Sequence, residues 1–360
     1  MAEPGPTRRT LLAGLASGLA VGCGSEAASV APGAMVALKD LAPFPVGVAA
    51  MTGQLGDPAW RALADRHFNQ ITPEWEMKME RVLRDDGSYD FSAADRLADY
   101  AAATGKRLLG HALIWYAQES PAFARLDGAG PAFERAYRNY VLEVAGRYRG
   151  RAVGWDVVNE PVAEDGDGYR DCVWRRNLGM AYVDRAFEHA READTAAVLL
   201  LNDYNLESKP AKRATFLRLL EGLLKRGTPV TGVGTQSHLE VELPPGAFRT
   251  CLRELAAFGL PVHVSELDVS FGRGPAAVVQ GDRALALKQA RLVEEAAEAL
   301  LELPPVQRFG LTLWGVRDAD SWLRRPPNDG GLPVDRPLLF DDAGRPKPAF
   351  EALARVLAKR

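Results

Sequence analysis

From about residue 44 onward, short apolar runs alternate along the chain with segments of helical periodicity. The apolar runs are rich in β-branched residues and predict strands at Phe44–Ala50, His67–Thr72, Arg107–Trp115, Ala152–Val158, Ala197–Leu201, Val230–Gln236, Pro261–Ser265 and Arg308–Trp314. The segments between them predict helices, among them Ser92–Thr104, Pro131–Arg147, Met180–Ala193, Pro210–Arg226, Gly246–Phe258 and Arg283–Leu301. Strands that alternate with helices pair in parallel through right-handed crossovers. Eight such units in roughly 320 residues predict a single (β/α)8 TIM barrel of the α/β class, which we assign to residues 41–360.

Polar or aromatic side chains stand at or just beyond the carboxyl ends of most of these predicted strands. They are Glu74 and Lys78, His111 and Trp115, Asn159 and Glu160, Asn202 to Asn205, Gln236 and His238, Glu266 and Asp268, and Trp314 and Asp318. Each has an ordinary structural explanation when taken alone, such as a satisfied core histidine or a solvated lysine. In a TIM barrel, however, all carboxyl ends meet on one face, and active sites lie there. Their joint occurrence therefore favours one functional site.

Two glutamates give this site its candidate chemistry. Glu160 follows Asn159 at the end of the apolar strand Arg151–Val158, and Pro161 then ends the ladder. Glu266 ends the predicted strand within the β-rich run Leu260–Val269. Glycoside hydrolysis needs one protonated and one ionised carboxyl group, held rigidly because their separation decides the stereochemical outcome. An isolated Asn-Glu-Pro would merely start a helix, but the second glutamate favours a catalytic pair.

Composition and charge restrict the range of partners. The 360 residues are 47% hydrophobic and 25% charged, as in an ordinary globular protein, and the net charge is −3. This balance gives no basis for binding nucleic acid, whereas a neutral polysaccharide is compatible with it. There is no close Cys/His cluster, so we expect neither a structural zinc nor another metal. Cys172 and Cys251 either form a disulfide or remain buried free thiols, and the second interpretation is favoured.

The N-terminal residues predict export rather than a folded element. Arg8 and Arg9 precede a small apolar run, Leu11–Gly22, which is too short to span a membrane. The paired arginines indicate a twin-arginine signal over residues 1–23. The run ends in a lipobox-like sequence at Cys23, so the protein is either anchored by lipid at Cys23 or cleaved nearby by an ordinary signal peptidase. Residues 24–40 are interpreted as a linker, and we expect a periplasmic or secreted protein.

Several ordered strings resemble glycoside hydrolase family 10, the retaining endo-1,4-β-xylanases. They are His67-Phe68-Asn69, Ile71–Glu74, Gly110-His111 with Trp115, Trp155–Glu160, Arg191–Asp194, Asn202–Asn205, Glu266–Asp268, Trp314–Val316, Asp318, Ser321-Trp322 and Pro346–Pro348. The resemblance extends from about Phe44 to about Leu357. It implies cleavage of internal bonds of xylan by double displacement through a covalent glycosyl-enzyme. It also implies a monomer that acts on xylan or xylo-oligosaccharides without a cofactor.

The resemblance also assigns roles to individual residues. Glu160 becomes the general acid/base and Glu266 the nucleophile, while Asn159 holds the sugar 2-hydroxyl at the cleavage point. His238 would bond Glu266, with Asp268 behind it to orient the imidazole ring. The substrate-binding residues that it implies are Glu74, Trp75, Lys78, His111, Trp115, Gln118, Tyr204, Asn205, Gln236, Trp314 and Trp322.

Three positions depart from the family pattern. Trp75 stands where the family usually has asparagine, Met79 where it has tryptophan, and Tyr116 where it has histidine. The missing asparagine and histidine line the glycone side of the family's cleft. Trp75 therefore either modifies a sugar subsite or packs beneath the neighbouring loop. Two alternatives to an endo-xylanase follow: an exo-acting or short-oligosaccharide hydrolase, and a carbohydrate-binding lipoprotein that has lost catalysis.

Overall fold

The computed structural model describes residues 36–117, 119–272, 282–325 and 335–359. The predicted signal with Arg8 and Arg9, the lipobox at Cys23 and the binding residue Gln118 lie outside the described residues and stay predictions. Helix α1 (Leu38–Leu41) overlaps the end of the predicted linker, and its Leu38 is fully buried. No helix in the described ranges is both long and apolar enough to cross a membrane.

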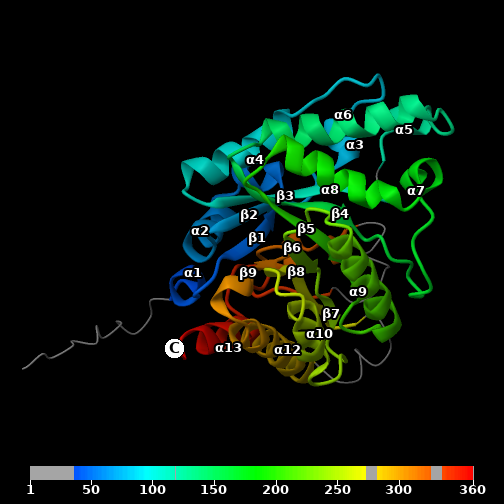
Figure 1. The fold of residues 1–360 in the computed structure, drawn as a ribbon. Helices are drawn as coiled ribbons and strands as arrows, with labels where there is room; N and C mark the ends of the chain where they lie inside the picture. Colours follow the sequence, from blue (N-terminus) through cyan, green and yellow to red (C-terminus); the bar gives the residue numbers. More distant parts are fainter. Residues whose placement is uncertain (1–35, 118, 273–281, 326–334, 360) are drawn as a thin grey trace, which may run out of the picture. The chain divides into compact units, whose positions relative to one another are not determined.

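Parallel strands close into a barrel, as the alternating pattern predicts. The strands are β1 (Val46–Ala50), β2 (Gln70–Pro73), β3 (Arg107–Trp115), β4 (Ala152–Asn159), β5 (Val198–Asp203), β6 (Gly232–Thr235), β7 (His238–Glu240), β8 (Val262–Ser270) and β9 (Arg308–Leu313). They follow one another in order around the sheet, and pairing of β6 with β8 closes it. Helices cover the outside of the barrel (Figure 1), and most residues of the strands other than β7 are buried. The predicted (β/α)8 barrel is confirmed.

Two short strands, β6 and β7, together occupy one position of the barrel beside β8. They correct the predicted ends of two strands, at Gln236 and at Ser265. β6 ends at Thr235, and β7 resumes after Ser237, whose φ of 64° breaks the extended conformation. Both segments pair in parallel with β8, and His238 lies opposite Asp268. β8 therefore continues to Ser270, and the predicted end at Ser265 is wrong. Glu266 therefore lies inside a strand and not at its end. The strand continues because β7 pairs with residues Asp268 to Ser270 of β8, beyond the predicted end at Ser265.

Helices surround the strands in the expected order. The longer ones are α2 (Pro58–His67), α4 (Ser92–Ala103), α6 (Pro131–Arg147), α8 (Ala181–Ala193), α9 (Pro210–Lys225), α10 (Ala247–Ala256), α12 (Asp282–Glu302) and α13 (Pro348–Leu357). Each of the six helices predicted from periodicity is present. The predicted strand start at His67 is wrong, because His67 is the last residue of α2, a helix that begins after its N-cap Asp57, which accepts from the backbone N–H groups of Ala59 and Trp60. α6 packs against α8 and α12 against α13 (Figure 1).

Strand packing also explains the Gly110-His111 string. A β-carbon on Gly110 would lie 2.1 Å from the indole of Trp155, so only glycine leaves room for that fully buried ring. His111, on the opposite face of β3, instead lines the pocket at the carboxyl end of the barrel. Cys172 and Cys251 are both buried free thiols, which confirms the favoured interpretation.

Candidate active site

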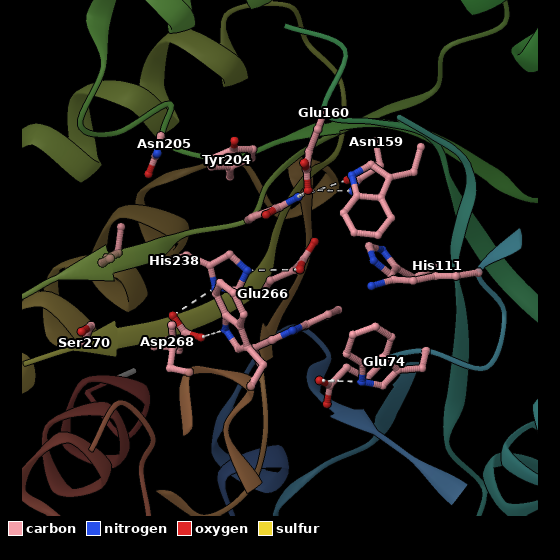
Figure 2. A pocket seen from close by; sticks show the side chains of 18 of the residues that line it. Glu74, His111, Asn159, Glu160, Tyr204, Asn205, His238, Glu266, Asp268 and Ser270 are labelled. Carbon is pink, nitrogen blue, oxygen red and sulfur yellow. Dashed lines mark hydrogen bonds and ion pairs between the residues drawn. The ribbon is translucent and has the colours of Figure 1, made fainter. Parts of the chain in front are cut away.

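A pocket of about 570 Å³ lies at the carboxyl ends of the strands. Apart from Gln118, every residue predicted for the site lines it: Glu74, Trp75, Lys78, His111, Trp115, Asn159, Glu160, Tyr204, Asn205, Gln236, His238, Glu266, Asp268, Trp314 and Trp322. The side chains of Glu160 and Glu266 project into this pocket, with His238 beside Glu266 (Figure 2). Residues more than one hundred positions apart thus meet because the barrel brings its strand ends together.

Glu160 is positioned by the turn that follows β4. Its φ of 59° lies in the left-handed region, so the chain leaves the strand at this residue, and its N–H still donates to the carbonyl oxygen of Asn202 at 2.8 Å. Two amide groups then donate to Oε1, from Asn159 Nδ2 at 3.0 Å and from Gln236 Nε2 at 2.8 Å. An oxygen that accepts two N–H bonds is not the one that carries a proton. The proton of the acid form therefore belongs on Oε2.

Glu266 is surrounded by positive charge and hydrogen-bond donors. Asn202 Nδ2 donates to Oε1 at 3.1 Å, and His238 Nε2 lies 3.3 Å from Oε2. Burial by itself would raise the pKa of Glu266, but His111, His238 and Lys78 outweigh it and hold that pKa below its usual value. Glu266 is therefore ionised at neutral pH, as a nucleophile must be.

His238 is charged by its two acidic neighbours. Burial alone would lower its pKa, but Asp268 and Glu266 raise it to about 10. His238 Nδ1 and Asp268 Oδ1 lie 3.0 Å apart and form an ion pair. The two atoms do not have the geometry of a regular hydrogen bond. Asp268 also accepts a 2.8 Å bond from Trp322 Nε1, and the Trp322 ring lies 5.0 Å from the imidazole. The imidazolium is thus fixed in place and in orientation.

Asn202 links the two glutamates, whereas the sequence identified it only as a polar residue at a strand end, without a role. Besides Glu266, its Nδ2 donates to Asn159 Oδ1 at 2.9 Å, while Ser265 Oγ donates to its Oδ1 at 2.9 Å. Gly234 makes room for it, because a β-carbon there would lie 2.3 Å from Asn202 Oδ1. The sequence signal that could have identified Asn202 is its position at the end of a predicted strand. In the structure this strand, β5, pairs with β4 and places Asn202 opposite Asn159.

One end of the pocket combines carboxylate, amine and indole groups. The Lys78 ammonium lies 4.8 Å from the Trp75 ring and 4.6 Å from the Trp115 ring. Glu74 Oε1 accepts from Trp75 Nε1 at 3.1 Å and from Arg325 at 2.5 Å. Burial raises the pKa of Glu74, although Arg325 and Lys78 oppose this. Arg325 was not predicted, because it lies 251 positions from Glu74 and in no matching string.

Trp75 faces the pocket, whereas Met79 does not. The indole lines the pocket and is partly exposed, while Met79 lies in the core and is 5% exposed. The arrangement fits the interpretation of Trp75 as a subsite residue better than that of a packing residue.

Aromatic rings and an asparagine form the remaining walls. Trp314 meets the His111 ring edge-on at 5.3 Å, and His111 Nδ1 lies 2.8 Å from the buried Asp156 carboxylate. Tyr204 and Asn205 follow β5, and Asn205 Nδ2 donates to Glu164 at 3.1 Å. Flat apolar rings beside directional polar groups suit a sugar, which has apolar faces and polar edges. Within the described ranges, no group of three or more His, Cys, Asp or Glu side chains could hold a metal ion.

Comparisons with known proteins agree with this geometry. Residues 37–356 match the family model of glycosyl hydrolase family 10. An endo-1,4-beta-xylanase A from Cellvibrio japonicus is 35% identical over 353 residues, which cover 90% of this chain and 57% of that protein, so this chain spans little more than half of its length. A beta-1,4-xylanase from Dictyoglomus thermophilum is 35% identical and covers 80% of this chain and 82% of its own.

A solved structure gives the same result at the level of the fold. Xylanase 10C from Cellvibrio japonicus, in complex with xylopentaose, superposes with a TM-score of 0.84 at 29% identity, over 90% of this chain and 69% of its own. The matched residues span the whole barrel, from α1 to α13. The chain belongs to glycosyl hydrolase family 10.

Proposed function

We propose that the chain is a retaining endo-β-1,4-xylanase that hydrolyses internal bonds of xylan through a covalent glycosyl-enzyme. The observation that carries the proposal is the contrast between two buried glutamates in one pocket. Glu266 is kept ionised because its neighbours His111, His238 and Lys78 lower its pKa, whereas Glu160 is bonded by the neutral amides of Asn159 and Gln236. Glycoside hydrolysis with retention requires this division between nucleophile and acid.

In the first step, an oxygen of Glu266 attacks the anomeric carbon while the bond to the glycosidic oxygen breaks. Protonated Glu160 delivers its proton to that leaving oxygen, and the departing sugar is released as an alcohol. In the second step, the Glu160 carboxylate takes a proton from water. The water oxygen then attacks the anomeric carbon and displaces Glu266. Two inversions at the same carbon restore the original β-configuration.

The neighbouring residues support these steps. Charged His238 donates to Glu266 and stabilises the carboxylate both before attack and as it leaves the sugar in the second step, while Asp268 holds the ring. Asn159 donates to Glu160, and the sugar 2-hydroxyl at the cleavage point is its second partner. The other lining residues bind the flanking sugars. Glu74, Trp75 and Lys78 lie at one end of the pocket and Tyr204 and Asn205 at another part of its wall.

Xylan or xylo-oligosaccharides are the proposed substrates. The support is the aromatic-lined pocket, the names of the related proteins, and the xylopentaose bound to the related Cellvibrio enzyme. The deciding experiment measures reducing ends released from xylan, cellulose and mannan, together with the anomer of the first product by NMR. We expect activity on xylan, a β-anomer first, and carboxyl groups about 5–5.5 Å apart. An α-anomer as the first product would overturn the mechanism, and product lengths distinguish endo from exo action.

Export is the second part of the proposal. The support is the sequence alone: Arg8 and Arg9 before a short apolar run, and Cys23 at its end. Replacing both arginines by lysine should retain the protein in the cytoplasm. If Cys23 carries lipid, Cys23→Ala should release the protein from the membrane fraction. Unchanged export of the double-lysine variant would exclude the twin-arginine route.

A further inference from the structure

We propose that Arg170 is a positioning residue for the acid/base Glu160, acting on the backbone that carries the catalytic carboxyl group. The inference rests on the proposed role of Glu160. The Arg170 Nε donates to the carbonyl oxygen of Glu160 at 3.0 Å, and the Arg170 backbone N–H donates to the carbonyl oxygen of Pro161 at 2.9 Å. One residue thus bonds two successive peptide groups of the turn that carries the acid.

This turn needs external support because Glu160 has a φ of 59°, a conformation disfavoured for residues that carry a β-carbon. The turn is held at both sides. Glu160 N–H donates to Asn202, and Val162 N–H donates to the buried carboxylate of Asp203 at 3.1 Å. Arg170 holds the carbonyl oxygens between these two points. A strained conformation persists only where its surroundings fix it in this way.

Arg170 is itself fixed against the wall of the pocket. Its guanidinium lies 4.0 Å from the centre of the Tyr116 ring and 5.5 Å from that of Tyr204. A second nitrogen donates to the Tyr204 hydroxyl at 2.6 Å, and Glu164 lies 3.5 Å away. Arginine suits this place because its planar group can stack on rings and donate in two directions at once. Through Arg170, the Glu160 turn is connected to the aromatic wall formed by Tyr116 and Tyr204.

Loss of this connection should affect proton transfer more than attack by Glu266. The Glu160 side chain keeps its bonds to Asn159 and Gln236, but its backbone is free to relax out of the left-handed conformation. A general acid that is displaced from the glycosidic oxygen protonates the leaving group poorly. The bonds of Glu266 to Asn202 and His238 do not involve the turn. Substrates that leave without protonation should therefore be cleaved as before.

The test uses aryl β-xylobiosides that share one glycone and carry phenols of graded acidity. kcat/KM on these substrates reports the first chemical step and involves no sugar on the aglycone side. For Arg170→Ala we expect kcat/KM to fall at least about tenfold with the least acidic phenol, but to stay within about threefold of wild type with dinitrophenol. Arg170→Lys keeps the charge without the planar guanidinium group. The slope of log kcat/KM against the pKa of the leaving phenol should lie between those of the wild type and Arg170→Ala. This variant keeps the test valid if Arg170→Ala does not fold.

Arg175→Ala is the matched control. Its guanidinium donates at 2.7 Å to the carbonyl oxygen of Tyr169, in the same loop, so its loss removes one loop bond without touching Glu160. We expect this control to keep the wild-type slope, and thermal melting to show that all variants are folded. An equal loss across all phenols, or an unchanged slope in the Arg170 variants, would overturn the inference. Absence of activity in the wild-type protein on every substrate would instead overturn the proposed function.

Discussion

Glu160 and Glu266 are the same residue type in one pocket, 7% and 4% exposed, yet their surroundings differ in kind. The Glu266 carboxylate lies beside a charged imidazole, whereas the Glu160 carboxyl group accepts bonds from two uncharged amides. Positive charge favours the ionised form of a carboxyl group, while amide donors can hold one of its oxygens and leave the other to carry a proton. The surroundings of the two glutamates, and not their residue type, therefore distinguish their proposed roles.

The backbone sharpens this comparison. Glu266 lies within β8, at a point where the register against β9 shifts between Val264 and Leu267, and its N–H donates to the carbonyl oxygen of Gln236 at 2.9 Å. Glu160 lies one residue beyond β4, with left-handed backbone geometry, and its backbone is bonded both by Asn202 of β5 and by Arg170 of the following loop. The proposed nucleophile thus lies inside a strand, whereas the proposed acid lies on the turn that follows a strand.

Removal of the nucleophile should have the largest effect. Glu266→Ala should lower kcat on xylan by about 10⁴-fold or more, because the covalent route is lost. Azide should restore part of the turnover by occupying the vacated space, and the product should be an inverted α-glycosyl azide, detectable by NMR. Glu242→Ala, at an exposed glutamate just beyond β7, is the control and should keep wild-type activity. A near-normal rate of Glu266→Ala without azide would contradict the assignment.

Removal of the acid should have a smaller effect that depends on the leaving group. For Glu160→Ala we expect kcat/KM on xylo-oligosaccharides to fall about 10²–10⁴-fold, because their leaving oxygen needs a proton. With an activated aryl glycoside, kcat/KM should change little. The two classes of substrate are compared by steady-state kinetics on the same enzyme preparation. Equal losses on both classes would remove the distinction between the two glutamates.

Removal of the imidazolium should change the pH dependence. His238→Gln takes a positive charge away from Glu266, so the pKa of Glu266 should rise and the acidic limb of the kcat/KM profile should move to higher pH. The native pKa of His238 is about 10, above its unfolded value of 6.5, so its contribution to stability is complete below pH 6.5 and lost as the pH rises through 10. Melting temperatures from pH 6 to 10 should therefore fall less steeply in the variant. An unchanged acidic limb would show that His238 does not control Glu266.

Substitution at the end of the pocket should have the smallest effect. Trp75→Asn removes a partly exposed indole that donates to Glu74 and lies against Lys78. We expect kcat/KM on short xylo-oligosaccharides to change by at least about tenfold, or about 1.4 kcal/mol in the transition state. The product lengths should shift, while the melting temperature stays nearly unchanged. A melting temperature several degrees lower, with unaltered products, would indicate that Trp75 is a packing residue.

The amino-acid sequence alone determined the architecture and most of the residues in the pocket. Alternating apolar runs and helical segments predicted the barrel, because hydrophobic periodicity is a local property of the chain. Polar residues such as Asn159 and Glu160 stand at the ends of the predicted strands. Their positions predicted one site at the carboxyl-terminal face of the barrel, because all parallel strands of a barrel end on that face. Resemblance to the family then suggested the roles of Glu160 and Glu266, which stay predictions until the variants are measured.

Only the tertiary structure decided which side chains touch. The apolar pattern predicted that β8 ends before Glu266, because pairing with β7 cannot be inferred from β8 itself. Asn202 was recognised only as a polar strand end, and its bonds to Asn159 and Glu266 depend on the register of β4, β5 and β8. Arg170 and Arg325 gave no signal, because their contacts with Tyr204 and Glu74 span 34 and 251 positions. Such contacts are fixed by closure of the barrel, which local sequence periodicity does not encode.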